Sequence, residues 1–283
     1  MRSDFASDTI NSIEDVCNNF GLTRDAWYKQ NYRKNYKKEK ENQVIKAVQN
    51  RRSILPFEGV RKLHFSISAE LNQVGIDIGR DALWRLLQSN NLLVKRRKKY
   101  VRTTNSDHPF YRYSNLIKDI TPVRPNQIWV SDITYISTHD GFLYLALITD
   151  AYSRKIVGYD ISDSLEMIGA QRALKKAIKQ RKGKTKTIHH SDHGIQYCAK
   201  KYIKTLKKSS IKISMGEIGN CYENAMAERV NGILKEEFGL DEKFKSKKQA
   251  LKSVNQAILL YNTERRHIKL NYNTPEFIHS MVI

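Results

Sequence analysis

The stretch QIWVSDITYIS, residues 127–137, decides the fold of the C-terminal half of this chain. Its side chains alternate between two faces, one of them largely apolar, as expected of a β-strand in a sheet. The segments that follow have periodicities of strands and helices in a definite order. That order is three strands, a helix, a strand, a helix and a strand: 127–137, 141–153, 155–162, 165–182, 185–192, 199–206 and 211–215. Three adjacent strands before the first helix predict an α/β fold, in which a five-stranded mixed sheet is flanked by helices.

The first hundred residues have helical patterns instead. Apolar residues at helical spacing end at Gly21, and Thr23 can cap a second helix. Farther along, FSISAELNQVGIDIGRDALWRLLQSNNLL (65–93) predicts two helices around a turn at Ile76–Gly79. The second helix is expected to bury Ala82, Leu83, Leu86 and Leu87. Such a pair is typical of a helix-turn-helix motif, whose second helix reads a DNA groove, although ordinary helical hairpins share the pattern.

Periodicity fades between Thr103 and Pro125, so a domain boundary is expected there. The resulting division has an N-terminal helix-turn-helix-like segment with a basic linker (1–42), a second helix-turn-helix DNA-binding domain (43–102), a linker (103–120) and a core with a C-terminal helical extension (121–283).

The charge balance indicates a polyanionic partner. Among 283 residues, 50 are Lys or Arg and 29 are Asp or Glu, giving a net charge of +21. The excess is spread over the chain, at +11 for residues 1–125 and +10 for 126–283. Double-stranded DNA is the commonest long polyanion, and the expected contacts are Arg80, Arg85, Lys95, Arg96, Arg97, Lys98 and Lys99.

Cysteine usage and hydropathy favour a cytoplasmic protein. Cys17, Cys198 and Cys221 are far apart, odd in number and form no CxxC pair, so neither a disulfide framework nor a zinc knuckle is indicated. No apolar run reaches the roughly 18 residues that a membrane-spanning helix needs.

Three carboxylates stand where a metal site is expected. Asp132 interrupts a largely apolar strand face, and Asp192 ends the strand HHSD just before Gly194. Glu228 belongs to a polar helical stripe with Asn224, Asn231 and Lys235. If the three acids converge at one sheet edge, their oxygens suit Mg²⁺ or Mn²⁺. The alternatives are that Asp132 bonds a loop amide, that Asp192 caps a helix and that Lys235 is a solvated surface lysine.

Two other chemistries compete with this interpretation. His189, His190 and His193 suggest zinc, but no cysteine or further histidine stands at ligand spacing from them. The C-terminal ERRHIKLNY, residues 264–272, offers a tyrosine nucleophile for DNA, yet that scheme leaves the carboxylates without a role.

Residues 121–277 resemble the integrase core of insertion-sequence transposases, in particular the second-reading-frame product of the bacterial family numbered three. The matching segments are PNQIWVSDITYI, YLALITDAYSRKIVGYDIS, HHSDHGIQY, ISMGEIGNCYENAMAERVNGILKEEF and YNTERRHIKLNYNTPEFI. The 59 residues between Asp132 and Asp192, and the 35 between Asp192 and Glu228, agree with that family. Glu223 and Arg266 depart from its usual Asp and Pro.

The resemblance implies a ribonuclease-H-like fold in which Asp132, Asp192 and Glu228 are catalytic and hold two Mg²⁺ or Mn²⁺ ions. It also implies cleavage and strand transfer at the element's terminal repeats, with Lys235 contacting DNA near the active site. A multimer on DNA is expected, and fusion to an upstream-frame product by frameshifting is a further feature of the family. The competing hypothesis is an inactive end-binding or regulatory protein.

Overall fold

A computed structural model describes residues 12–94, 111, 113–181, 186–216 and 224–281. The chain forms two compact units, which are described separately. The first comprises Met1–Arg51 and Ser66–Leu93, and the second comprises Arg52–Phe65 and Val94–Ile283. Within the described ranges, no helix combines the length and the apolar character needed to cross a lipid bilayer.

The first unit is helical. Its elements are α1 (Ile13–Asn19), α2 (Arg24–Ile54), α3 (Val60–Gln73), whose first turns belong to the second unit, and α4 (Arg80–Ser89). Gly21 has φ +63° between α1 and α2, and the Ala26 backbone N–H donates to Thr23 Oγ1 at 3.1 Å. These are the stop and the cap that the sequence predicts. The basic, aromatic stretch after Tyr28 is part of α2, so the expected boundary at 42/43 lies inside one continuous helix.

The turn between α3 and α4 follows the predicted pattern. Gly75 has φ +74°, a conformation that favours glycine, and Gly79 is the N-cap of α4. Leu83 and Leu87 face the interior of the unit. The prediction that Ala82 also points inward is wrong, because the buried face of α4 is narrow and Ala82 is exposed.

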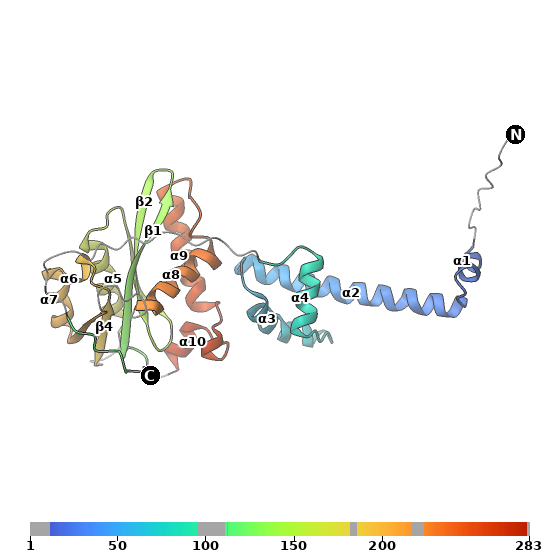
Figure 1. Ribbon diagram of the computed structural model, residues 1–283, viewed down its shortest axis with the longest axis horizontal. Helices are drawn as coiled ribbons and strands as arrows, with labels where there is room; N and C mark the ends of the chain where they lie inside the picture. Colours follow the sequence, from blue (N-terminus) through green and yellow to red (C-terminus); the bar gives the residue numbers. More distant parts are fainter. Residues whose placement is uncertain (1–11, 95–110, 112, 182–185, 217–223, 282–283) are drawn as a thin grey trace. The chain divides into compact units, whose positions relative to one another are not determined.

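A five-stranded mixed sheet forms the centre of the second unit (Figure 1). Its strands are β1 (Ile128–Thr138), β2 (Gly141–Asp150), β3 (Ile156–Ser162), β4 (Thr187–Ser191) and β5 (Ile211–Met215). The order across the sheet is β3-β2-β1-β4-β5. The first three strands pair antiparallel, whereas β4 runs parallel to β1 and β5 parallel to β4. The mixed sheet with hairpins first and crossovers later is therefore confirmed.

Helices cover both faces of the sheet, as Figure 1 shows. They are α5 (Met167–Gln180), α6 (Ile195–Cys198), α7 (Lys200–Lys208), α8 (Ala225–Phe238), α9 (Lys247–Thr263), the 3₁₀ helix η2 (Ile268–Leu270) and α10 (Pro275–Ser280). One core joins Trp129 of β1 to α5, α6 and α7, for example through Leu174 and Tyr202. The other joins Ile136 of β1 to α8 and α9, for example through Val230. Alternation along β1 thus feeds two separate cores.

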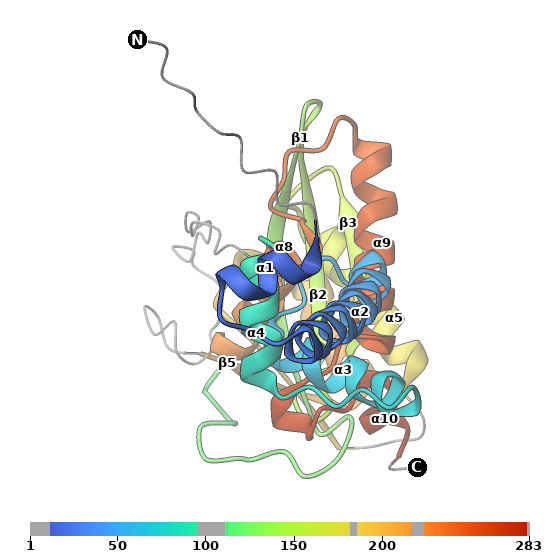
Figure 2. The same cartoon turned by 90° about the vertical axis from the view of Figure 1, so that its right-hand side faces the viewer.

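The β1–β2 hairpin projects past the rest of the sheet beside the segment that precedes α9 (Figure 2). Thr138 forms a parallel bridge with Phe244 at this point, and the His139 backbone N–H donates to the Phe244 carbonyl at 2.9 Å. The bridge fixes the start of α9 against the long central strand, so that α9 lies over the same face as α8.

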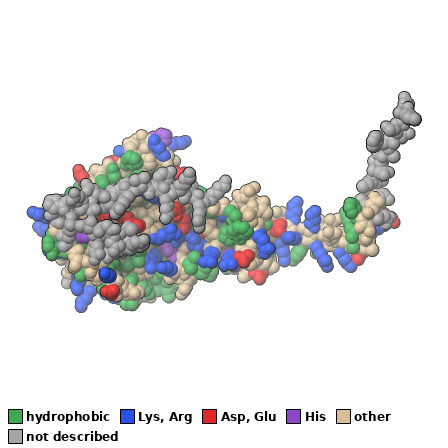
Figure 3. Space-filling model, viewed as in Figure 1, with side chains coloured by type: hydrophobic (Ala, Val, Ile, Leu, Met, Phe, Trp, Pro, Cys, Tyr) green, Lys and Arg blue, Asp and Glu red, His purple; other side chains and the backbone are tan. Residues whose placement is uncertain are grey.

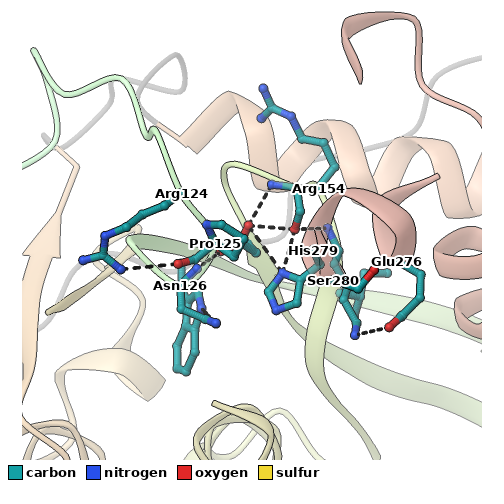
Figure 4. A network of polar contacts seen from close by, with 12 residues as sticks. Arg124, Pro125, Asn126, Arg154, Glu276, His279 and Ser280 are labelled. Carbon is teal, nitrogen blue, oxygen red and sulfur yellow. Dashed lines mark hydrogen bonds and ion pairs between the residues drawn. The ribbon is translucent and has the colours of Figure 1, made fainter. Parts of the chain in front are cut away.

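A buried acid at the end of β2 holds the C-terminal helix. The carboxylate of Asp150 accepts hydrogen bonds from Ser153 N and Oγ, each at 2.7 Å, and Ser153 Oγ lies 2.9 Å from His279 Nδ1. Lys155 Nζ pairs with Glu276 Oε1 at 2.8 Å, and Figure 4 shows these contacts reaching α10. Protein groups satisfy Asp150, so its role is to dock α10 on the β2–β3 turn.

Candidate active site

The parallel pairing of β1 and β4 brings two of the predicted acids to one edge of the sheet. The last paired residues are Val130 of β1 and His190 of β4. Asp132 and Asp192 each stand two residues beyond that pair, where the two strands diverge. The Gly194 backbone N–H donates to Asp192 Oδ1 at 3.0 Å, which turns the chain into α6.

Helix α8 lays its polar stripe against β1. The side-chain amide of Asn231 donates to Asp132 Oδ2 at 2.7 Å, and that of Asn224 donates to the Ser131 carbonyl at 3.2 Å. One turn beyond Asn231, Lys235 Nζ lies 4.2 Å from the centre of the Tyr135 ring. Three members of the predicted stripe, Asn224, Asn231 and Lys235, therefore contact the acid-bearing strand, whereas its fourth member Glu228 is exposed.

The environment of Asp132 opposes its negative charge. Burial of the carboxyl group and the nearby charge of Asp192 raise its pKa to about 7, against hydrogen bonds from Asn231 and the Ile133 backbone N–H that lower it. The charge of Glu228 adds a smaller upward contribution. Two like charges in a poorly solvated place disfavour ionisation of both, unless a cation neutralises them.

Glu228 lies in the first turn of α8 and is exposed to solvent. Its charge reaches Asp132, but the described residues include no cluster of three His, Cys, Asp or Glu side chains close enough to hold a metal ion together. The structure thus brings Asp132 and Asp192 together and leaves Glu228 at the margin of the same site.

Unsatisfied polar atoms surround the two aspartates. Among the described residues, Oδ1 of Asn224, Oδ1 of Asn231 and the hydroxyl of Tyr197 are buried without a hydrogen-bond partner. Burial raises the pKa of Tyr197, and the nearby charges of Asp132 and Asp192 raise it further. The phenol of Tyr197 therefore lies close to both aspartates. Acceptor oxygens and carboxylates make an oxygen-rich set, which suits a hard divalent cation with bound water. Helical spacing in the sequence places Asn224 in the polar stripe, but no sequence pattern points to Tyr197.

Comparisons with known proteins identify the family of this chain. Residues 122–221 match an integrase core domain family, and residues 209–275 match a second family with the same description. A 31 kDa protein of insertion element IS600 from Shigella sonnei is 34% identical over 92% of this chain and 96% of its own length. The transposase of insertion sequence IS629 from the same organism is 34% identical over 77% of this chain and 72% of its own.

The chain belongs to the insertion-sequence transposases with an integrase core. Among solved structures, the catalytic core domain of HTLV-2 integrase in complex with magnesium is similar with a TM-score of 0.45 and 19% identity, over 56% of this chain and 99% of that one.

The histidines of this transposase have structural partners. Nε2 of the buried His189 lies 2.7 Å from Ser131 Oγ and 2.9 Å from the Tyr202 hydroxyl, and burial lowers its pKa to about 3. His190 Nδ1 lies 2.9 Å from Ser214 Oγ. A neutral His189 therefore braces β1 and β4 from the face opposite α8, and the zinc alternative has no support among the described residues.

The predicted DNA contacts lie in different surroundings. Arg80 and Arg85 are exposed on α4, where Asp81 accepts from Arg80 Nε at 2.8 Å through its carboxylate and from Arg85 Nε at 3.4 Å through its backbone carbonyl. Lys235 is partly buried beside the candidate site, and desolvation lowers its pKa while the charges of Asp132 and Asp241 oppose that shift. Lys95, Arg96, Arg97, Lys98 and Lys99 lie outside the described residues.

Proposed function

We propose that this transposase cleaves DNA at the terminal repeats of its element and joins the ends to target DNA, with divalent metal ions held by Asp132, Asp192 and Glu228. One observation carries the proposal: burial and the neighbouring charge of Asp192 raise the pKa of Asp132 to about 7, although the cation of Lys235 interacts with the charge of Asp132. A polar cluster of this kind in an integrase core needs a positive charge from outside the chain.

The chain's own residues prepare this site. Asn231 and the Ile133 backbone N–H orient the carboxylate of Asp132, while the Gly194 backbone N–H orients that of Asp192. Glu228 is the third ligand, supplied from α8. Two Mg²⁺ or Mn²⁺ ions, when bound, would activate the attacking oxygen and stabilise the leaving oxygen of the phosphodiester. The ribonuclease-H-like chemistry requires no covalent link between protein and DNA.

DNA binding is proposed to involve both parts of the chain. Residues 43–102 form the helix-turn-helix domain, with Arg80 and Arg85 on its second helix and Lys95, Arg96, Arg97, Lys98 and Lys99 after it. The other proposed parts of the chain are an N-terminal segment with a basic linker (1–42), a second linker (103–120) and the catalytic core (121–283). Lys235 contacts the phosphate backbone beside the active site. Joining two ends of one element calls for a multimer on DNA, and fusion to an upstream-frame product is a further proposal.

The proposal is tested by cleavage of a labelled duplex that carries the terminal repeat of the encoding element. With Mg²⁺ we expect strand cleavage by the wild-type chain, and none with EDTA. Glu228→Gln and Asp132→Asn should each reduce the rate by at least about 10³-fold, because metal ligation contributes several kcal/mol to catalysis. Binding of the same duplex should persist in both variants.

Glu236→Gln is the matched control, since Glu236 is also an exposed acid of α8 and, within the described part of the chain, pairs only with Arg229 at 3.9 Å. It should cleave at the wild-type rate. Wild-type cleavage by Glu228→Gln would exclude the carboxylate assignment. Tight binding of the ends without cleavage, even with the upstream-frame product present, would favour an end-binding protein instead.

A further inference from the structure

Helix α2 contains a short repeat that the proposed catalytic function does not use. Residues 28–39 read YKQN, YRKN and YKKE, so that a tyrosine followed by a lysine or arginine recurs every four residues. The tyrosines are Tyr28, Tyr32 and Tyr36. Residues four apart lie on one face of a helix, and each step advances about 6 Å along its axis. We call these three side chains the tyrosine ladder.

The tyrosine ladder is exposed rather than part of a core. Tyr28, Tyr32 and Tyr36 retain 49%, 72% and 55% of their accessible surface. The rings of Tyr32 and Tyr36 are parallel within 5°, with centres 6.3 Å apart. The buried residues recorded for α2 are all nearer its C-terminal end, at Val44, Ala47 and Val48. Exposed aromatic rings in a row on one helix form an apolar surface that a ligand can contact.

Cations accompany the ladder. Lys29, Arg33 and Lys37 each follow a tyrosine, and Figure 3 shows Lys and Arg side chains distributed along this helix. Residues 24–41 contain seven basic and three acidic residues. Lys29 pairs with Asp25 at 2.7 Å and Lys37 with Glu41 at 3.8 Å. The side chain of Arg33 has no ion-pair or hydrogen-bond partner among the described residues, and the cation that lies over a ring of the ladder is Lys40, whose Nζ is 4.6 Å from the centre of Tyr36.

We propose that the tyrosine ladder binds single-stranded DNA. Aromatic side chains that stack bases, set beside cations that neutralise phosphates, are the combination used for single strands. Stacked bases of a duplex advance about 3.4 Å along each strand, which is little more than half of the ladder's step of about 6 Å. The rings therefore match a strand whose bases are unstacked. A second copy of this helix would bring the same net positive charge, which argues against self-association.

The test is fluorescence anisotropy of the full chain with a labelled oligothymidine and with a duplex of equal length, both in EDTA. Tyr32→Leu/Tyr36→Leu should weaken oligothymidine binding by at least about tenfold, because stacking on each ring is lost. Duplex binding should change less than about threefold. Tyr32→Phe/Tyr36→Phe keeps both rings and should bind as the wild type does. Arg33→Gln should make the salt dependence of oligothymidine binding shallower.

Tyr111→Leu is the matched control, since Tyr111 is 76% exposed outside α2 and its removal should leave binding unchanged. Circular dichroism verifies that the leucine variant keeps its helix. Unchanged oligothymidine binding by that variant, or an equal loss on the duplex, would overturn the proposal. So would a change of mass in light scattering without DNA, which would assign the ladder to self-association. Because no metal or cleavage is involved, failure here leaves the proposed catalytic function standing.

Discussion

Two carboxylates at α8, Glu237 within the helix and Asp132 packed against it, have opposite electrostatic surroundings. Near the C-terminal end of α8, Glu237 accepts two hydrogen bonds from Arg265, at 2.8 and 2.7 Å, and pairs with Lys62 at 2.7 Å. Burial alone would raise the pKa of Glu237, but these cations lower it to about 2. Asp132 of β1 accepts a hydrogen bond from Asn231 of α8, and burial together with the charges of Asp192 and Glu228 raises its pKa to about 7. One acid is neutralised inside the protein and the other is not.

Under the proposed function, this difference separates Glu237, a structural acid, from Asp132, a metal ligand. The Glu237 network is complete within the chain, and Arg265 is almost fully buried in it. A buried pair of this kind fixes the end of α8 against the segment that follows α9. The Asp132 site leaves buried oxygens of Asn224 and Asn231 without partners, which fits the cation and bound water of the proposed function.

The largest expected effect on the free energy of unfolding is that of a substitution at Glu237, whose charge the protein neutralises. Glu237→Gln leaves Arg265 and Lys62 without their anion and should lower the free energy of unfolding by about 3 kcal/mol at pH 8. Because the folded-state pKa is depressed, this stabilisation is complete above the ordinary value of 4.5 and is lost as pH falls toward about 2. Urea unfolding at several pH values measures it. An unchanged free energy of unfolding in Glu237→Gln would contradict this account of α8.

The matching amide substitution at Asp132 should change the free energy of unfolding in the opposite direction. Asp132→Asn removes a charge that the folded state disfavours, and should raise the free energy of unfolding by about 2 kcal/mol at pH 8 in EDTA. The raised pKa means that the native chain binds more protons than the unfolded chain between about pH 4 and 7. Stability of the wild type should therefore fall as pH rises through that window.

The same urea experiment checks this prediction, with Glu236→Gln as a control that should stay close to the wild type. If Asp132→Asn lowered the free energy of unfolding as much as Glu237→Gln does, both acids would be structural. The contrast between Asp132 and Glu237 would then disappear.

Sequence patterns predict the sheet and the position of its acids well, because alternation along residues 128–136 and the polar stripe of α8 are local signals. The parallel pairing that brings Asp132 beside Asp192 also follows from element order. Patterns fail for partners that are close only in the fold. Glu237 and Arg265 are 28 residues apart and have no common motif, and the role of Asp150 depends on α10.

In the first unit, sequence patterns do not predict which side chains of the helices are exposed. The sequence of α2 is basic and aromatic, which fits either a linker or a solvated helix, and only the structure shows the ladder of Tyr28, Tyr32 and Tyr36 on one face. The spacing of Ala82 fits a helical stripe, but the structure buries only Leu83 and Leu87 fully and Leu86 in part, and leaves Ala82 exposed. Helical spacing identifies a face without giving its width.

The most direct test of the central claim, that the Asp132 site needs an external cation, is thermal unfolding of the full chain with and without Mg²⁺. At a concentration about tenfold above the dissociation constant, Mg²⁺ should stabilise the wild type by about 1.4 kcal/mol, seen as a higher melting temperature. Asp132→Asn should lose that shift, and Glu237→Gln should keep it on its lower baseline. An equal shift in the wild type and Asp132→Asn, or none in the wild type, would contradict the account.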